Sequence, residues 1–161
     1  MKPLVSGQKK MTNCKRFWED FVVGERYSTS TRTITEEDQD HFCRLVGYDA
    51  PLFVDDSQAQ ETLYPRRICP SHLIMSIATA MTGRLFKDSL LGLLGIDNGK
   101  FMEPVMPGDT LSTEVEVIEK RLTSKAGRGI IIFRDHVFNQ HGVEVFKVDK
   151  ITLIRCRKMG A

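Results

Sequence analysis

Hydrophobic side chains recur through the segment PSHLIMSIATAMTGRL, from Pro70 to Leu85. The apolar positions leave no wholly polar face, so the pattern predicts a helix that is buried on nearly all sides. Pro70 suits a first helical turn, where its missing N–H is not needed, and Gly83 is a typical helix stop. An ordinary core helix and a helix that takes part in chemistry both fit this pattern.

Most of the chain after this helix alternates between apolar and polar residues in the manner of β-strands. The clearest case is 111–117, where Leu, Thr and Val alternate with Ser and Glu. A second strand is predicted within 90–102, interrupted by Gly95, Asp97, Asn98 and Gly99. Strands are also predicted over the apolar run 130–133 and over 143–154, where the alternation slips between Val145 and Phe146 and predicts a bulge. One buried helix before these strands predicts an α+β fold, a long central helix wrapped by a curved antiparallel sheet.

The segment before the central helix predicts four further features. Residues 26–34 are rich in β-formers and predict a first strand. Thr35 and Asp38 form a capping pair for a helix that ends at Gly47, with an acidic first turn rather than a metal site. Residues 47–56 are expected to form a loop, and residues 57–64 a short helix capped by Ser57.

The single domain is expected to span residues 15–161, because residues 1–14 lack periodicity and predict a flexible N-terminal tail. A sheet of this size leaves edges that need protection. Joining two copies edge to edge would protect them, so we expect a homodimer.

Composition excludes several classes of function. The net charge of +2 is too small to indicate nucleic-acid binding, and no apolar run is long enough to cross a membrane. No two of the four cysteines form a CxxC pair, which favours free thiols in a reducing compartment. We therefore expect a cytoplasmic protein. No histidine or cysteine spacing indicates a metal site, and no phosphate-binding loop of the Gly-rich kind occurs.

Several segments, in this order and at these spacings, resemble the MaoC-like dehydratases, hot-dog-fold proteins that include the (R)-specific enoyl-CoA hydratases. The resemblance covers residues 17–157, nearly the whole chain. The segments that carry it are RTITEEDQDHF, GYDAPLFVD, ICPSHLIMS, FMEPVMPGDTL, GRGIIIF, NQHGVEVFK and ITLIR.

The resemblance implies which substrate the protein binds and where the substrate lies. The central helix would lie inside a curled antiparallel sheet, two subunits would join their sheets, and an acyl thioester would lie in a tunnel at their interface. The expected partners are therefore an acyl-CoA or acyl-carrier thioester and a second copy of the chain. No cofactor is expected apart from coenzyme A as part of the substrate.

The loop of the hydratases that carries their acid and base reads G-D-x-N-P-L-H, and this chain matches it in part. Gly47 and the Pro51-Leu52 pair are retained. Tyr48 stands at the Asp position and Phe53 at the His position, so the binding frame is present and the family's acid–base pair is absent. Phe53 cannot accept a proton, and the phenol of Tyr48 is a weak base.

Nearby residues supply replacements for that pair. Asp49 follows the expected Asp position by one residue, and His72 lies in the first turn of the central helix, so the two are candidate catalytic groups. The backbone N–H of Ser71 is a candidate donor to the thioester oxygen, and Thr79 falls where the family has a serine that supports the Asp. Asp49 as a turn cap and His72 as a locally bonded side chain are the structural alternatives.

Other residues complete the predicted site. Tyr48 is a further catalytic candidate, and Pro51 and Phe53 are expected to line the acyl site. Three basic residues are candidates for binding coenzyme phosphates: Arg84, Lys100 and Arg128.

Three functions remain open at this point. The leading one is a hydro-lyase of the enoyl-CoA hydratase or 3-hydroxyacyl dehydratase kind with a rearranged site. The second is a thioester-binding or partner subunit without catalysis, which the missing His favours. The third is a hot-dog thioesterase with Asp49 as base, since one fold hosts several chemistries.

Overall fold

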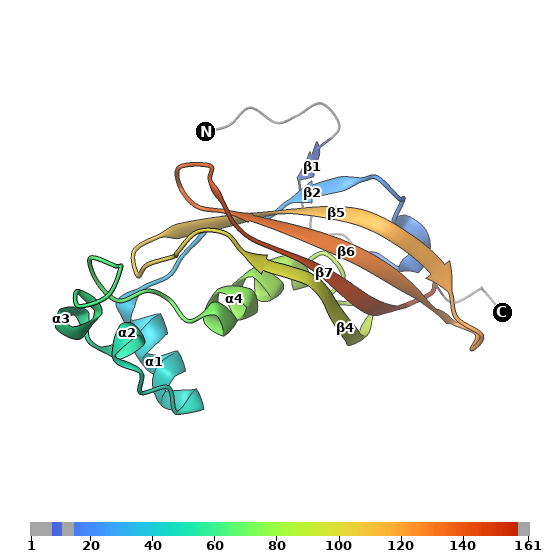
Figure 1. Cartoon of the computed structure of the whole chain (residues 1–161). Coiled ribbons are helices and arrows are strands. Elements are labelled where there is room, and N and C mark those ends of the chain that lie inside the picture. The colour runs from blue at the N-terminus through green and yellow to red at the C-terminus, as the bar shows by residue number, and fades with distance from the viewer. Residues whose placement is uncertain (1–7, 11–14, 158–161) are drawn as a thin grey trace.

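The computed structural model describes residues 8–10 and 15–157. Its central element is helix α4 (Ser71–Gly83), which lies against one face of a curved sheet (Figure 1). Four long strands build most of that sheet: β4 (Leu90–Phe101), β5 (Thr110–Leu122), β6 (Arg128–Phe138) and β7 (Glu144–Arg155).

The strand order places β4 at an open edge. The order is β1-β2-β5-β6-β7-β4, with β1 (Gln8–Lys10) parallel to β2 (Arg26–Ser28) and the other pairs antiparallel. The short strand β3 (Arg32–Thr33) also pairs with β5. This arrangement confirms the predicted α+β class, with a single helix held by an antiparallel sheet.

The core lies between α4 and the sheet and contains two apolar clusters. The first surrounds the start of α4, where Leu73, Ile74 and Ala78 pack on Val137 and Val148. The second lies beyond the end of α4 and is largely aromatic. It comprises Phe21, Tyr27, Leu85, Phe86, Val115, Val117, Ile131, Phe133 and Ile154.

One face of α4 is open, so the prediction of burial on nearly all sides was wrong. Ser71, His72, Ser76 and Ala80 are exposed, whereas Leu73, Ile74 and Ala78 face the sheet. The sheet covers only one side of the helix in a single chain, and the small and polar residues gather on the other side.

Helix α1 (Glu36–Val46) begins and ends as predicted. Thr35 Oγ1 accepts from the Asp38 N–H at 3.0 Å, and Asp38 Oδ2 accepts from the Thr35 N–H at 2.9 Å, a reciprocal capping box. Gly47 ends the helix with φ of 74°, a left-handed conformation that glycine adopts without strain.

The segment between α1 and α4 differs from the prediction. The expected loop at 47–56 contains a one-turn helix, α2 (Pro51–Val54), which Pro51 opens. The expected helix at 57–64 is shorter and earlier, α3 (Asp56–Ala59), and its cap is Asp55 rather than Ser57. Asp55 Oδ1 accepts from the Ser57 and Gln58 N–H groups at 2.9 and 3.1 Å.

The strands also refine the predicted pattern. The strand expected over 26–34 is divided into β2 and β3, and β4 runs continuously through its glycines with three register shifts. The predicted bulge in the last strand is confirmed, because Phe146 and Glu144 pair with successive residues of β6 and leave Val145 extra. A 3-10 turn, η1 (Trp18–Asp20), packs on β6.

Residues 8–10 of the expected N-terminal tail form β1, and residues 1–7 and 11–14 lie outside the described residues. Among the described residues, no helix has the length and apolar character needed to span a membrane.

Candidate functional site

The start of α4 carries unused backbone donors. Pro70 is the N-cap and supplies no side-chain cap, while its carbonyl accepts from the Leu73 and Ile74 N–H groups at 3.0 and 3.2 Å. The N–H groups of Ser71 and His72 have no acceptor among the described residues. Both residues are exposed. The helix dipole adds positive potential here, so this end can hold a carbonyl oxygen that gains negative charge.

A buried amide fixes the loop next to that helix start. Gln39 Nε2 on α1 donates to the Phe53 carbonyl at 2.7 Å and to the Ile68 carbonyl at 3.0 Å. Gln39 is fully buried. It therefore joins α2 to the segment that leads into α4. Sequence reasoning missed Gln39, for which the only signal is its position on the same face of α1 as Phe42 and Cys43.

Aromatic rings pack around the candidate residue Tyr48. Its ring centroid lies 6.4 Å from that of Phe42 and 5.4 Å from that of Phe53. Pro51 is exposed at the start of α2, and Phe53 is half-buried. The residues at the Asp and His positions of the family loop thus form an apolar contact with α1 rather than a proton-transfer pair.

Asp49 lies beside α1 in this chain. It lines a shallow hollow of about 280 Å³ together with Tyr48 and residues of α1 and α2. Neither Asp49 nor His72 makes a side-chain hydrogen bond or ion pair with any described residue, so the two are not bonded to each other within one chain. Their catalytic role stays a prediction, and both side chains are free to meet a ligand.

Thr79 shares the open face of α4 with His72. The two are seven residues apart, which is close to two helical turns, and Thr79 is half-buried. Its carbonyl accepts from Thr82 Oγ1 at 3.2 Å. A ligand lying along this face would therefore pass the helix start, His72 and Thr79 in turn.

The three candidate phosphate ligands do not converge in one chain. Lys100 lies opposite Lys147 near the start of β7, and Arg128 lies opposite Arg155 at its end. Those two β7 positions are eight residues apart, about 26 Å along a strand. Arg84 is the C-cap of α4, at the end of the helix remote from Ser71. Of the three, only Lys100 lies toward the helix start.

Among the described residues, no cluster of histidine, cysteine and carboxylate side chains could hold a metal ion. The described cysteines are free thiols, and burial raises the pKa of Cys69 to about 12, so this thiol is not a ready nucleophile.

Comparison with known proteins identifies relatives of the chain. A family model described as MaoC like domain matches residues 20–131. The chain is 30% identical over 151 residues to a β-methylmalyl-CoA dehydratase of Chloroflexus aurantiacus, an alignment that covers 93% of this chain and 43% of the relative. The chain spans less than half the length of the first curated relatives that it matches.

Solved structures share the fold. The (R)-hydratase PhaJ1 of Pseudomonas aeruginosa superposes with a TM-score of 0.69 at 27% identity, covering 89% of this chain and 86% of that one. A conserved hypothetical protein of Mycobacterium tuberculosis with a double hot-dog fold gives a TM-score of 0.82 at 18% identity, covering 91% and 47%. These likenesses confirm the predicted hot-dog fold.

Proposed function

The chain belongs to the family of MaoC-like domains, a family of hydratases and dehydratases, and on that premise we propose that it is a hydro-lyase acting on acyl thioesters. The reaction is the addition of water across the double bond of an enoyl thioester, or its reverse, in the (R)-specific manner of the (R)-hydratases.

The observation that carries this proposal is the open start of α4. When water adds to the β-carbon, electrons move toward the thioester oxygen. The N–H of Ser71 has no acceptor within residues 8–10 and 15–157 and lies at a helix N-terminus, so it can hold that oxygen as charge develops. This donor is a backbone group and does not depend on the family's missing side chains.

Asp49 and His72 supply the proton transfers in this proposal. The Asp49 carboxylate accepts a proton from the attacking water as the new C–O bond forms at the β-carbon. His72 gives a proton to the α-carbon and regains one from solvent, and Asp49 releases the proton that it accepted to solvent, so both groups return to their starting states. Neither side chain is committed to another described residue, which supports their availability.

A second copy of the chain completes the site in this proposal. The open edge β4 exposes Leu90, Leu91, Leu93, Leu94 and Ile96, each more than two-fifths exposed. The uncovered face of α4 adds to this surface. Leucines in such number on an unpaired edge strand are typical of an interface between subunits, and pairing two such edges would enclose the ligand.

The test is hydration of crotonyl-CoA by the purified chain, followed as loss of enoyl absorbance. Asp49→Asn and His72→Asn are expected to lower kcat by about a hundredfold or more. Glu61→Gln, which removes an exposed carboxylate from the loop after α3, serves as the matched control and is expected to keep full activity.

Two other outcomes would replace the proposal. Binding of acyl-CoA without turnover, across short, long and branched acyl groups, would identify a partner subunit of the kind that Phe53 in place of a histidine favours. Release of free coenzyme A thiol from a saturated acyl-CoA would identify a thioesterase.

A further inference from the structure

The connection between β4 and β5 runs beside the segment that leads into α4 (Figure 1). The Cys69 N–H donates to the Val105 carbonyl at 2.7 Å. Arg66 Nη2 donates to the Pro107 carbonyl, also at 2.7 Å. In these two contacts the earlier residue of one segment meets the later residue of the other. The two segments are therefore antiparallel where they touch.

Glu103 lies beside the start of α4 in this arrangement. Two residues beyond the backbone bond of Cys69, the first segment reaches Ser71, and the antiparallel connection reaches Glu103. The Met102 N–H donates to the Val145 carbonyl at 2.9 Å, which anchors the connection on the other side of Glu103. Val145 belongs to the core cluster at the first turns of α4, so both anchors hold Glu103 at this end of the helix.

The carboxylate of Glu103 is not neutralised by a cation. Glu103 is exposed, and its side chain makes no hydrogen bond or ion pair with any described residue. The two arginines before α4 are committed elsewhere. Arg66 reaches the Pro107 carbonyl, further along the connection than Glu103. Arg67 forms an ion pair with Asp40 on α1, with Nη1 and Oδ1 2.5 Å apart.

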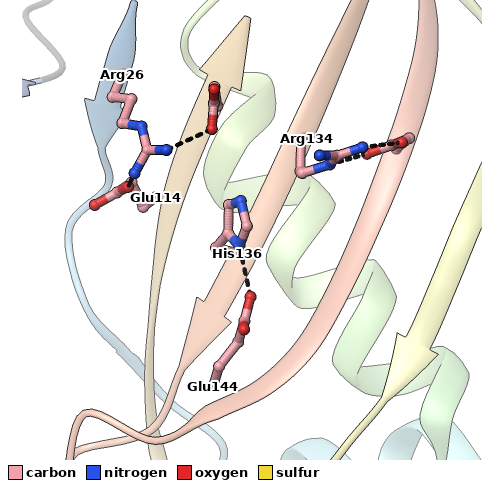
Figure 2. A network of polar contacts seen from close by, with 7 residues as sticks. Arg26, Glu114, Arg134, His136 and Glu144 are labelled. Atoms are coloured by element: carbon pink, nitrogen blue, oxygen red, sulfur yellow. Dashed lines mark hydrogen bonds and ion pairs between the residues drawn. The ribbon is translucent and has the colours of Figure 1, made fainter. Parts of the chain in front are cut away.

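Carboxylates on the outer face of the sheet are paired, in contrast. Figure 2 shows Glu114 with Arg26, whose Nη1 lies 2.8 Å from Oε1. Arg134 donates to Asp149 through Nε at 2.6 Å and through Nη2 at 2.7 Å, a forked pair (Figure 2). Ion pairing of this kind accounts for those acidic residues and does not account for Glu103.

An unpaired carboxylate changes which groups the start of α4 attracts. The helix dipole gives this end a positive potential, which favours anions in general. The negative charge of Glu103 opposes that potential. A thioester oxygen is still held by a direct hydrogen bond from the Ser71 N–H, whereas the far end of an acyl chain meets only the combined field of the helix and Glu103.

We propose that Glu103 is a specificity-determining residue, which makes the site favour uncharged acyl groups over acyl groups that end in a carboxylate. The inference rests on the proposed function for the place of the thioester, with its oxygen at the Ser71 N–H. The far end of a short acyl chain lies only a few ångströms from that point, so a carboxylate there would be repelled by Glu103. Repulsion of the wrong ligand is a general source of specificity.

The experiment compares equilibrium binding of valeryl-CoA and glutaryl-CoA by calorimetry. Both carry a saturated five-carbon acyl group, and only glutaryl-CoA ends in a carboxylate, so the ratio of the two dissociation constants isolates the acyl charge. The wild type is expected to bind valeryl-CoA more tightly. Glu103→Gln is expected to lower that preference about fivefold, chiefly by strengthening the binding of glutaryl-CoA.

The matched control is Glu61→Gln, which removes an exposed carboxylate from the loop after α3 and is expected to keep the wild-type ratio. Glu103→Lys is expected to lower the ratio further than Glu103→Gln does, because a positive charge attracts the glutaryl carboxylate. The difference between the wild type and Glu103→Gln is expected to shrink as salt rises, because mobile ions screen exposed charges.

Three results would overturn the inference: an unchanged ratio in Glu103→Gln at the melting temperature of the wild type, a wild type that prefers glutaryl-CoA, or binding of neither ligand. Neither ligand has a double bond, so this readout needs no turnover. If crotonyl-CoA is not hydrated and Glu103→Gln still lowers the preference, the role of Glu103 stands and the hydratase proposal fails. If crotonyl-CoA is hydrated and the ratio is unchanged, only the inference about Glu103 fails.

Discussion

Lys150 and Asp135 form an ion pair inside the core, beneath α4. The Lys150 Nζ lies 2.5 Å from Asp135 Oδ2, and their side chains are 3% and 0% exposed. Lys150 also donates to Thr82 Oγ1 on α4, and Thr82 Oγ1 lies 3.2 Å from the same carboxylate oxygen. This polar contact ties β6 and β7 to the second half of the helix.

Removing Lys150 alone is expected to destabilise the fold strongly. Lys150→Met leaves the Asp135 carboxyl buried without its cation, and burial already raises the pKa of that carboxyl. The expected loss is about 3–5 kcal/mol of unfolding free energy, measured in urea. The double variant K150M/D135L replaces both charges by apolar groups and is expected to recover most of that loss.

The matched control is Lys147→Met, at a lysine of the same strand that points outward, with an expected change within about 0.5 kcal/mol. Equal destabilisation in K150M and K150M/D135L would show that the loss of unfolding free energy comes from packing and not from the unpaired buried carboxyl of Asp135.

Gln39→Leu is expected to loosen α2 and the segment that leads into α4. The substitution removes the two hydrogen bonds to the Phe53 and Ile68 carbonyls while keeping a similar side-chain volume. The expected cost is about 2 kcal/mol, since two partly buried carbonyls lose their donor. Hydrogen exchange over residues 50–68 is expected to rise, and kcat for crotonyl-CoA to fall. Gln60→Leu, at an exposed position, is the control.

Gly129→Ala is expected to displace Trp18. A β-carbon at Gly129 would lie 2.2 Å from Trp18 Nε1, which donates to the Ile130 carbonyl at 3.3 Å. Overpacking of this kind costs about 1–3 kcal/mol. In a double-mutant cycle with Trp18→Ala the two costs are expected to be less than additive, because the smaller residue makes room for the methyl group. Strict additivity would argue against the contact.

The Arg134–Asp149 pair is expected to make stability depend on pH in the acid range. The guanidinium of Arg134 holds the pKa of Asp149 below its ordinary value. A lowered pKa in the folded state means that the stabilisation is complete above the unfolded-state pKa of about 4. It is lost as the pH falls through the lower folded-state value.

Urea unfolding of the wild type and Asp149→Asn measures this effect. The difference in unfolding free energy is expected to be about 2 kcal/mol at pH 7 and to shrink below pH 4. The control Asp97→Asn, at an exposed neighbour on β4, is expected to show no such trend. A wild-type advantage that persists unchanged at pH 2 would contradict the assignment.

Leu94→Glu is expected to separate the proposed dimer. Leu94 is the most exposed of the β4 leucines, at 56%, so a charge there is tolerated in a single chain and costly at an interface. Sedimentation is expected to show a monomer. Crotonyl-CoA turnover by this variant is expected to be reduced. Leu63→Glu, at a 92% exposed loop position, is the control and is expected to leave the assembly unchanged. A wild type that sediments as a monomer would refute the dimer directly.

The sequence predicts α4 and the long strands well, because their signals are local. Pro70 and Gly83 mark the helix ends to within a residue, and the alternation at 111–117 fixes which side chains face the helix. Thr35 and Gly47 likewise bound α1, since capping depends on residues only three or four positions apart.

The short helices and the open helix face are harder to predict. A one-turn helix such as α2 has no periodicity, and Asp55 and Ser57 are both suitable caps that only the backbone path distinguishes. Ser71, His72 and Ser76 stand at one face of α4, but their exposure depends on how far the sheet wraps.

The candidate site depends on the path of a loop, which no pattern encodes. The sequence places Asp49 one position from the family's Asp, yet the residues that its side chain faces depend on how the loop after Gly47 passes α1 and α2. The pairing of Lys100 with Lys147 cannot be predicted from local patterns either, because it depends on the register of β4 on β7. The charge of Lys150 conflicts with its buried position, and alternation does not predict that position, because Val148, Asp149 and Lys150 are all buried in succession.

The register shifts in β4 have a consequence for biosynthesis. They bend this edge of twelve residues at three points, so it offers a curved template that suits a strand with the same bends. A straightened β4, without its extra residues, would present the same leucines to any extended polypeptide emerging from the ribosome. Overexpression would then be expected to yield inclusion bodies.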